Sequence, residues 1–167
     1  MKDYAVRVAT LSDAAGVGAL LRASYPILMA PAYDEAVLAP ALQLMTRANP
    51  ALLESGTFYV AEAQDGLMVG CGGWTLEPPG GDAVKATLGH IRHFGTHPDW
   101  TERGIGRAIY RLCEADARSA GITSFECDAS LNAEKFYSAL GFESIRRRDV
   151  ELSAGVVLPG VLMRCRL

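Results

Sequence analysis

The hydrophobic pattern at the start of the chain predicts a strand followed by a helix. Residues 4–9 alternate between apolar and polar side chains, as a short strand does. Next, the apolar Val17, Leu20 and Leu21 and the small Ser24 recur at helical spacing. Ser12 or Asp13 can cap this helix, because both side chains accept a hydrogen bond from free backbone N–H groups.

Prolines interrupt the segment that follows, residues 25–54. A weaker helical pattern covers residues 34–49, with Asp34 as the cap and with Leu38, Leu42 and Met45 on one face. Pro40 is expected to disturb this helix if it falls beyond the first turn, because proline has no N–H group and clashes with the preceding turn. We therefore expect residues 25–54 to be the least regular part of the chain, since they contain Pro26, Pro31, Pro40 and Pro50.

The middle of the chain predicts a meander of antiparallel strands. Two runs rich in Val, Phe, Tyr and Trp flank Asp65-Gly66, a dipeptide that tolerates the positive φ angles of a tight hairpin turn. A third strand over residues 86–96 completes the meander.

Helices and strands then alternate to the end of the chain. The pattern predicts a helix over 104–120, a strand over 122–128, a helix over 132–140 and strands over 142–152 and 161–167. This order indicates an α/β (α+β) fold in which a mixed central sheet combines an N-terminal antiparallel meander with a βαβ crossover. We expect about four helices and a single domain over residues 1–167.

Composition and charge remove several classes of function. Lys and Arg total 16 against 19 acidic residues, so the formal charge of −3 offers no general attraction to nucleic acid. No signal-peptide core and no run of 18 apolar residues occurs, which predicts a cytoplasmic protein that does not enter a membrane. The cysteines form no CxxC pair, so buried reduced thiols are expected at Cys71, Cys113, Cys127 and Cys165. His90 and His93 point to opposite faces of a regular strand, so no metal site is expected there.

The stretch "TERGIGRAIY" joins the third strand of the meander to the helix over 104–120. The start of a helix offers unpaired N–H groups and a partial positive charge, which together attract anions. Gly104 and Gly106 carry no side chains, so a phosphate or pyrophosphate can approach the main chain closely. The same glycines are also compatible with a strand-to-helix turn that binds nothing.

Two well-known phosphate-binding motifs do not fit this turn. A Walker loop requires a Lys followed by Ser or Thr, and neither pair follows the glycines. The dinucleotide-binding pattern requires a third glycine where Ile109 stands, and it follows a βαβ unit rather than a meander.

A second segment, "SLNAEKFYSALGF", suggests a family. Together with the turn Thr101-Glu102-Arg103-Gly104-Ile105-Gly106, it resembles the GNAT superfamily of acyl-CoA N-acyltransferases. That family's phosphate turn is commonly Gln/Arg-x-x-Gly-x-Gly/Ala, and its later helix often reads Asn-x-x-Ala-x-x-Phe-Tyr or a shortened form. The match covers the element order of nearly the whole chain, and its residue-level weight lies in residues 91–142. Thr101 departs from the family pattern.

The resemblance implies acetyl-CoA as co-substrate, with no metal. Its pyrophosphate would be held by the turn, through the main chain of Thr101, Glu102, Arg103, Gly104, Ile105, Gly106 and Arg107, with Asn132 nearby. Because Thr101 replaces Gln or Arg, we expect the side chains of Arg103 and Arg107 to supply charge, unless they are simply solvated. The backbone of Phe94, Gly95 and Thr96 would polarise the thioester carbonyl, at a strand bulge that Gly95 suits.

The resemblance also implies a reaction, transfer of an acetyl group to a primary amine by direct attack and a tetrahedral intermediate. Tyr137 matches the family tyrosine that often donates a proton to the departing thiolate; the alternative is an aromatic packing residue beside Phe136. His90 occupies about the position where some members carry a base, and it titrates near neutrality. Glu126 and Asp128 are reserve bases.

The acceptor is expected to be a small-molecule or amino-acid-like amine bound against residues 25–54, at Tyr25, Met29, Tyr33 and Met45. Dimers are common in the family, and the apolar C-terminal strand offers an interface for a homodimer. Two other interpretations stay open: a non-catalytic acyl-CoA-binding sensor or interaction domain, and a nucleotide-binding α/β protein.

Overall fold

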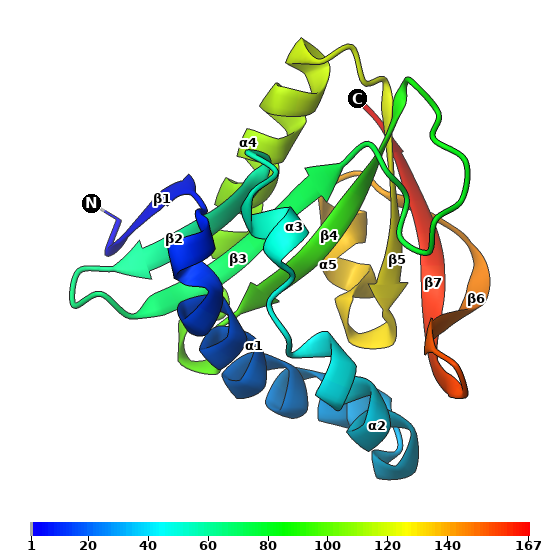
Figure 1. Ribbon diagram of the computed structural model, residues 1–167, viewed down its shortest axis with the longest axis horizontal. Helices are drawn as coiled ribbons and strands as arrows, with labels where there is room; N and C mark the ends of the chain where they lie inside the picture. Colours follow the sequence, from blue (N-terminus) through cyan, green and yellow to red (C-terminus); the bar gives the residue numbers. More distant parts are fainter. Residues whose placement is uncertain (1) are drawn as a thin grey trace.

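The computed structural model describes residues 2–167, which form seven strands and five α-helices (Figure 1). The strands are β1 (Tyr4–Val8), β2 (Phe58–Ala63), β3 (Met68–Thr75), β4 (Leu88–Thr96), β5 (Ser124–Ser130), β6 (Glu143–Ser153) and β7 (Val156–Arg166). The helices are α1 (Ala14–Met29), α2 (Glu35–Met45), α3 (Pro50–Leu53), α4 (Ile105–Ser119) and α5 (Glu134–Ala139). The helix that the sequence did not predict is α3, a single turn.

All the strands join one mixed sheet in the order β1-β2-β3-β4-β5-β7-β6. Strands β1 to β4 are antiparallel neighbours, and β4 and β5 are parallel and joined through α4. The predicted meander and βαβ crossover are therefore confirmed. Strand β5 also pairs antiparallel with β7, which places the final hairpin beside the crossover.

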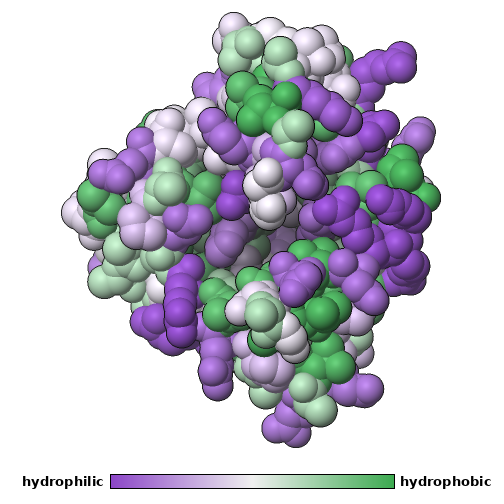
Figure 2. Space-filling view, turned by 45° about the vertical axis from the view of Figure 1, so that its right-hand side comes forward, coloured by the Kyte–Doolittle hydropathy of each residue, from purple (hydrophilic) through white to green (hydrophobic). Residues whose placement is uncertain are grey.

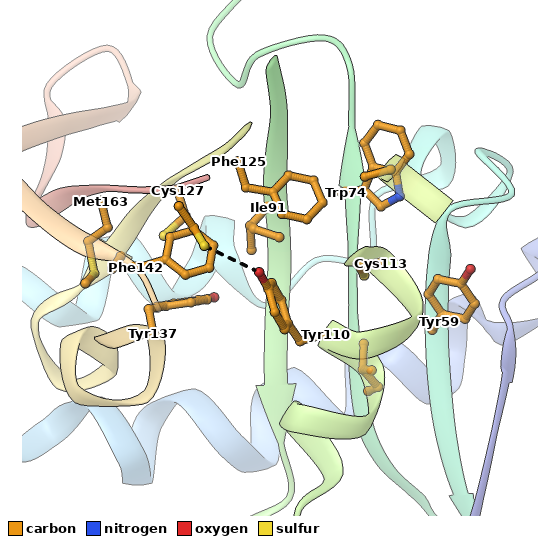
Figure 3. Packing of buried hydrophobic residues seen from close by; sticks show 14 of the residues in the cluster. Tyr59, Trp74, Ile91, Tyr110, Cys113, Phe125, Cys127, Tyr137, Phe142 and Met163 are labelled. Atoms are coloured by element: carbon orange, nitrogen blue, oxygen red, sulfur yellow. Dashed lines mark hydrogen bonds between the residues drawn. The ribbon is translucent and has the colours of Figure 1, made fainter. Parts of the chain in front are cut away.

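Helices cover both faces of the sheet. On one face, α4 and α5 pack on the larger core, in which the Tyr110 ring lies 6.2 Å from Phe125 and 5.8 Å from Phe142 (Figure 3). On the other face, α1 and α3 cover a second core, and α2 packs against β7. The sequence analysis expected Cys71, Cys113, Cys127 and Cys165 to be buried free thiols, and this is confirmed.

One leucine of the amphipathic helix α4 is exposed. Leu112 is 38% exposed, whereas Tyr110 and Ala117 are buried. Each step of four residues advances about 40° around a helix. The stripe of buried positions at 105, 109, 113 and 117 therefore turns away from Leu112 along the helix.

The proline-containing segment is mostly helical, so the prediction that it is the least regular part was wrong. Helix α1 continues through Pro26 to Met29, and α2 continues through Pro40. Pro40 is exposed, and the neighbouring Leu38 and Ala41 are buried against the rest of the core. This packing outweighs the loss of one hydrogen bond on the solvent side of the helix. Pro50 takes the first position of α3, where a missing N–H costs nothing.

The C-terminal strand is longer than predicted and lies inside the sheet. Strand β7 begins at Val156 and pairs with β5 on one side and β6 on the other. Both edges of β7 are therefore paired over residues 160–164, so a second copy cannot add a strand there; the expected homodimer itself stays a prediction. None of the helices within residues 2–167 combines the length and hydrophobicity that crossing a bilayer requires.

Candidate active site

The central feature of the candidate site is a gap between two parallel strands. β4 and β5 pair only from Leu88 to His90, opposite Ser124 to Glu126, and then diverge (Figure 1). A bulge in β4 lies just beyond the paired part, where the register with β3 shifts and His93 has a φ of 49°. A positive φ at a residue other than glycine is uncommon and is typical of functional sites.

The gap opens into a groove of about 880 Å³. Its walls come from α1, the end of β4, the start of α4, the end of β5, α5 and the β6–β7 hairpin. Figure 2 shows the molecule hollowed near the centre of one face, with hydrophobic residues along the lower edge of the hollow.

The end of β4 directs backbone groups toward this gap. His97 N–H bonds the Val69 carbonyl at 2.9 Å and Gly95 lies opposite Cys71, so alternation turns the backbone of Phe94 and Thr96 away from β3. Side chains of helix α1 donate hydrogen bonds to the carbonyls on that side. The Tyr25 hydroxyl donates to Phe94 O at 2.8 Å, and the Ser24 hydroxyl donates to Thr96 O at 2.6 Å.

The bulge does not lie at Gly95, as the sequence analysis expected. Gly95 keeps its place in the β3–β4 ladder, and the irregularity falls at His93 instead. The expected backbone contact to a thioester therefore rests on the N–H groups of Phe94 and Thr96, because that of Gly95 faces β3.

The turn before α4 has the geometry of an anion site. Glu102 and Gly104 have φ angles of 62° and 77°, and Gly104 is the N-cap of α4. The first hydrogen bond of the helix runs from Ala108 N–H to Gly104 O at 2.9 Å. The N–H groups of residues 105–107 precede that bond, so they point out of the helix end toward a ligand.

The two glycines of the turn have different roles. Gly104 is free of neighbours, and its left-handed conformation explains why glycine is needed there. A Cβ atom at Gly106 would lie 2.8 Å from the Phe136 ring. Gly106 therefore lets α4 pack closely on α5, a role that the sequence analysis did not foresee when it assigned both glycines to ligand approach.

The expected cofactor-binding residues lie along the groove, except Arg103. The guanidinium of Arg103 stacks on the Trp100 ring at 4.5 Å and does not line the groove, whereas Arg107 does. The Thr101 hydroxyl donates to Pro98 O at 3.3 Å. The other predicted residues that line the groove are Phe94, Gly95, Thr96, Thr101, Glu102, Gly104, Ile105, Gly106, Asn132 and Tyr137.

Tyr137 lies at the inner wall of the groove. The residue is 6% exposed, and its ring packs against Phe94 and Phe136 at centroid distances of 6.2 and 5.0 Å. The ring of Phe142 lies beside it at 5.4 Å (Figure 3). The Tyr137 hydroxyl forms no hydrogen bond with another residue of 2–167. Burial raises the pKa of this phenol well above its ordinary value, so Tyr137 carries its proton at neutral pH.

His90 does not line the groove. It is 8% exposed and lines an adjoining pocket of about 100 Å³, together with Glu126 and Asp128. Burial lowers the pKa of His90, which favours the neutral imidazole. Glu126 accepts hydrogen bonds from the Arg164 guanidinium. Asp128 lines both the pocket and the groove and therefore connects them.

Residues that the sequence analysis did not assign also line the groove. Arg92 and His93 both do, and burial lowers the pKa of His93 to about 4. The alternation of side chains along residues 86–96 predicts a regular strand. Nothing in the sequence therefore identified the bulge that turns the His93 side chain into the groove. Tyr33 was expected in the acceptor wall with Tyr25, Met29 and Met45, and it alone of these does not line the groove. Its hydroxyl instead links Pro159 O at 2.6 Å to Leu131 N–H at 2.8 Å.

Comparisons with known proteins agree with this geometry. The model of the acetyltransferase (GNAT) domain family matches residues 54–144. A GCN5-related N-acetyltransferase from Rhodopseudomonas palustris has a similar structure, with a TM-score of 0.75, 27% identity, and coverage of 100% of this chain and 98% of that one. No curated protein matches the sequence significantly.

Two further solved structures share the fold at lower identity. The PaiA N-acetyltransferase from Thermoplasma acidophilum, in complex with coenzyme A, has a TM-score of 0.72 and 17% identity, and the match covers 98% of this chain and 99% of that one. Rv2747 from Mycobacterium tuberculosis, in complex with CoA, has a TM-score of 0.63 and 24% identity, with 98% and 99% covered. With its family-model match, splayed strands and glycine turn, the chain belongs to the GNAT acetyltransferase family.

Proposed function

We propose that the protein transfers an acetyl group from acetyl-CoA to the primary amine of a small-molecule or amino-acid-like acceptor. One observation carries the proposal: the free N–H groups at the start of α4, the backbone N–H groups of β4 and the Tyr137 hydroxyl all border one groove. These are the donors that anion binding, carbonyl polarisation and proton return require.

The residues of the groove fit coenzyme A in charge and hydrogen bonding. The N–H groups of residues 105–107 and the Arg107 guanidinium would hold the pyrophosphate. The N–H groups of Phe94 and Thr96 would pair with the carbonyls of the pantetheine arm and the thioester. When bound, acetyl-CoA supplies an activated acyl group.

Proton transfer involves two groups on different sides of the reacting carbon. His90, neutral at pH 7, accepts the proton of the acceptor ammonium through water or through Asp128. The free amine attacks the thioester carbonyl directly and forms the C–N bond of a tetrahedral intermediate. The attacking nitrogen then loses its second proton to solvent, and the intermediate collapses as the C–S bond breaks. Tyr137 gives its proton to the departing thiolate and regains one from solvent.

The acceptor end of the groove favours a small molecule. Leu28 and Met29 of α1, Met45 of α2 and Leu152 and Leu158 of the β6–β7 hairpin line it. Such a wall binds apolar groups and has few carboxylates to attract a polycation. This composition speaks against a histone tail or an aminoglycoside.

A thiol-release assay tests the function. The purified protein is incubated with acetyl-CoA and a panel of primary amines, and free CoA thiol is measured. An acyltransferase releases thiol only when an acceptor is present. A sensor domain would gain thermal stability from acetyl-CoA without releasing thiol, and a nucleotide-binding protein would be stabilised by ATP or NAD instead.

Two variants assign the roles. Arg107→Gln should weaken CoA binding about 10-fold, whereas Arg111→Gln, one turn further along α4 and paired with Glu114 at 2.8 Å, should leave it unchanged. His90→Ala should remove the acidic limb of the pH–rate profile. A profile identical to that of the wild type would exclude His90 as the base.

A further inference from the structure

Two oppositely charged residues lie on the two strands that border the mouth of the β4–β5 gap, Arg92 on β4 and Asp128 on β5. His90 is in register with Glu126, so the next residues on the same face are Arg92 and Asp128. The strands have begun to diverge there. Among residues 2–167, no carboxylate lies within 4.0 Å of the Arg92 guanidinium, and both side chains line the groove.

Arg92 is held in place and still has donors to offer. It is half-buried, and one guanidinium nitrogen, Nη1, donates to the Thr75 hydroxyl at 3.0 Å. A guanidinium carries five N–H donors in a planar fork, which matches the two oxygens of a carboxylate. Arg92 therefore presents a fixed cation to a ligand in the groove.

Asp128 presents the opposite charge on the facing strand. Its side chain is 16% exposed, and its carboxylate accepts no hydrogen bond from residues 2–167. The cation in direct contact with it is Arg148, whose Nε lies 3.4 Å from Oδ1, and Arg146 and His90 also act on its charge. A buried carboxylate without hydrogen bonds is costly, so a ligand ammonium beside it would be strongly favoured.

An apolar wall begins beside this pair of charges. Met29 is buried, and Met45, Leu152 and Leu158 lie with it between α1, α2 and the β6–β7 hairpin. The groove thus brings together a cation for an acid group, an anion for an amine and a surface for a hydrocarbon chain.

Resting on the proposed acetyl transfer, we propose that the acceptor is an α-amino acid with an apolar side chain. Its carboxylate binds Arg92, its amino group lies beside Asp128 at the edge of the gap, and its side chain contacts Met29, Met45 and Leu158. The transfer forms the amide C–N bond and breaks the C–S bond. The ammonium loses two protons in becoming an amide; one is balanced by the proton that the thiolate gains, and the other is released to solvent. The product is an N-acetyl amino acid, with CoA as the released thiol.

The test compares acceptors that differ only in the carboxylate. In the thiol-release assay, L-leucine is matched with 3-methylbutylamine and L-methionine with 3-(methylthio)propylamine. We expect kcat/KM at least 100-fold higher for each amino acid. L-Leucine should also exceed L-aspartate and L-lysine, because only an apolar side chain fits the methionine and leucine wall.

Substitutions test which residues recognise the carboxylate and the amine of the acceptor. Arg92→Gln should lower kcat/KM for L-leucine about 100-fold and change it less than threefold for 3-methylbutylamine, and Arg92→Lys should restore part of the loss. Asp128→Asn should lower kcat/KM for both acceptors, since both carry the amine. Arg47→Gln and Asp149→Asn, both on exposed residues, are the matched controls. Melting temperature and CoA affinity show whether each variant is folded. If Arg92→Gln does not fold, Arg92→Lys takes its place in the comparison of acceptors.

The outcomes separate this inference from the proposed function. Thiol release from amines with no preference for the amino acid, or equal losses for both members of a pair in Arg92→Gln, would overturn the inference and leave acetyl transfer standing. Release from no amine and no amino acid would overturn both.

Discussion

Tyr137→Phe separates catalysis from stability. The substitution removes one hydroxyl and keeps the ring, which Phe94, Phe136 and Phe142 hold by edge-to-face contacts. The hydroxyl forms no hydrogen bond with residues 2–167, so no partner is left unsatisfied in the variant. The free energy of unfolding should therefore change by less than about 0.5 kcal/mol.

The effect on turnover should be much larger. A positioned general acid contributes about 10²–10⁴-fold to a rate, and we expect about 100-fold here because water can also protonate a thiolate. That loss corresponds to about 2.7 kcal/mol in the activation free energy. The raised pKa keeps the phenol protonated from pH 6 to pH 9, so the loss should be the same throughout this range.

The assay is thiol release under single-turnover conditions, with CoA affinity and urea unfolding measured on the same preparations. We expect kcat to fall about 100-fold, while the Kd for CoA and the unfolding midpoint stay at the wild-type values. Unchanged turnover would remove Tyr137 from the chemistry. A fall in stability that matches the fall in rate would make it a packing residue.

Three further predictions concern the fold around the groove. Gly106→Ala should lower the free energy of unfolding by about 1 kcal/mol, because the new methyl group would lie 2.8 Å from the Phe136 ring; an unchanged urea midpoint would contradict the close α4–α5 packing. In an NMR titration the His93 ring should protonate near pH 4, and stability should decline as pH falls from 6.5 toward 4, since burial lowers the pKa and the unfolded chain binds the proton first. A titration midpoint of the His93 ring near pH 6.5 would contradict the burial of this side chain. Asp13→Asn should cost about 1 kcal/mol at pH 7, because the half-exposed Arg7 holds the Asp13 carboxylate by bonds of 2.8 and 2.9 Å and lowers its pKa. This stability is present above the unfolded pKa of about 3.9 and is lost as pH falls through the lower folded pKa, so in urea unfolding the deficit of the variant should shrink as pH falls below about 3.9; a deficit that does not shrink would point to lost packing.

Local sequence signals predicted most of the elements that build the groove. The Asp65-Gly66 turn, the alternation of β5 and the two-glycine start of α4 depend on residues close in the chain, so one sequence is enough to identify them. The family resemblance added Tyr137 and Asn132, and both border the groove in the structure.

The features that were missed depend on contacts between distant segments. Pro40 sits in a helix because α2 packs on β7, and His93 enters the groove because β4 bulges against β3. Neither partner strand can be identified from the residues around Pro40 or His93. The placement of Arg92 and Asp128 on neighbouring strands at one groove likewise follows only from the parallel register of β4 and β5.

The central claim is that backbone nitrogens at the start of α4 bind the pyrophosphate of coenzyme A. It is tested most directly by titrating the ¹⁵N-labelled protein with CoA and following the amide signals of Ile105, Gly106 and Arg107, with pantetheine, which has no pyrophosphate, as the control. We expect these three amide protons to shift downfield and saturate with CoA and to stay in place with pantetheine. Saturable CoA binding that leaves all three signals unmoved would contradict the claim.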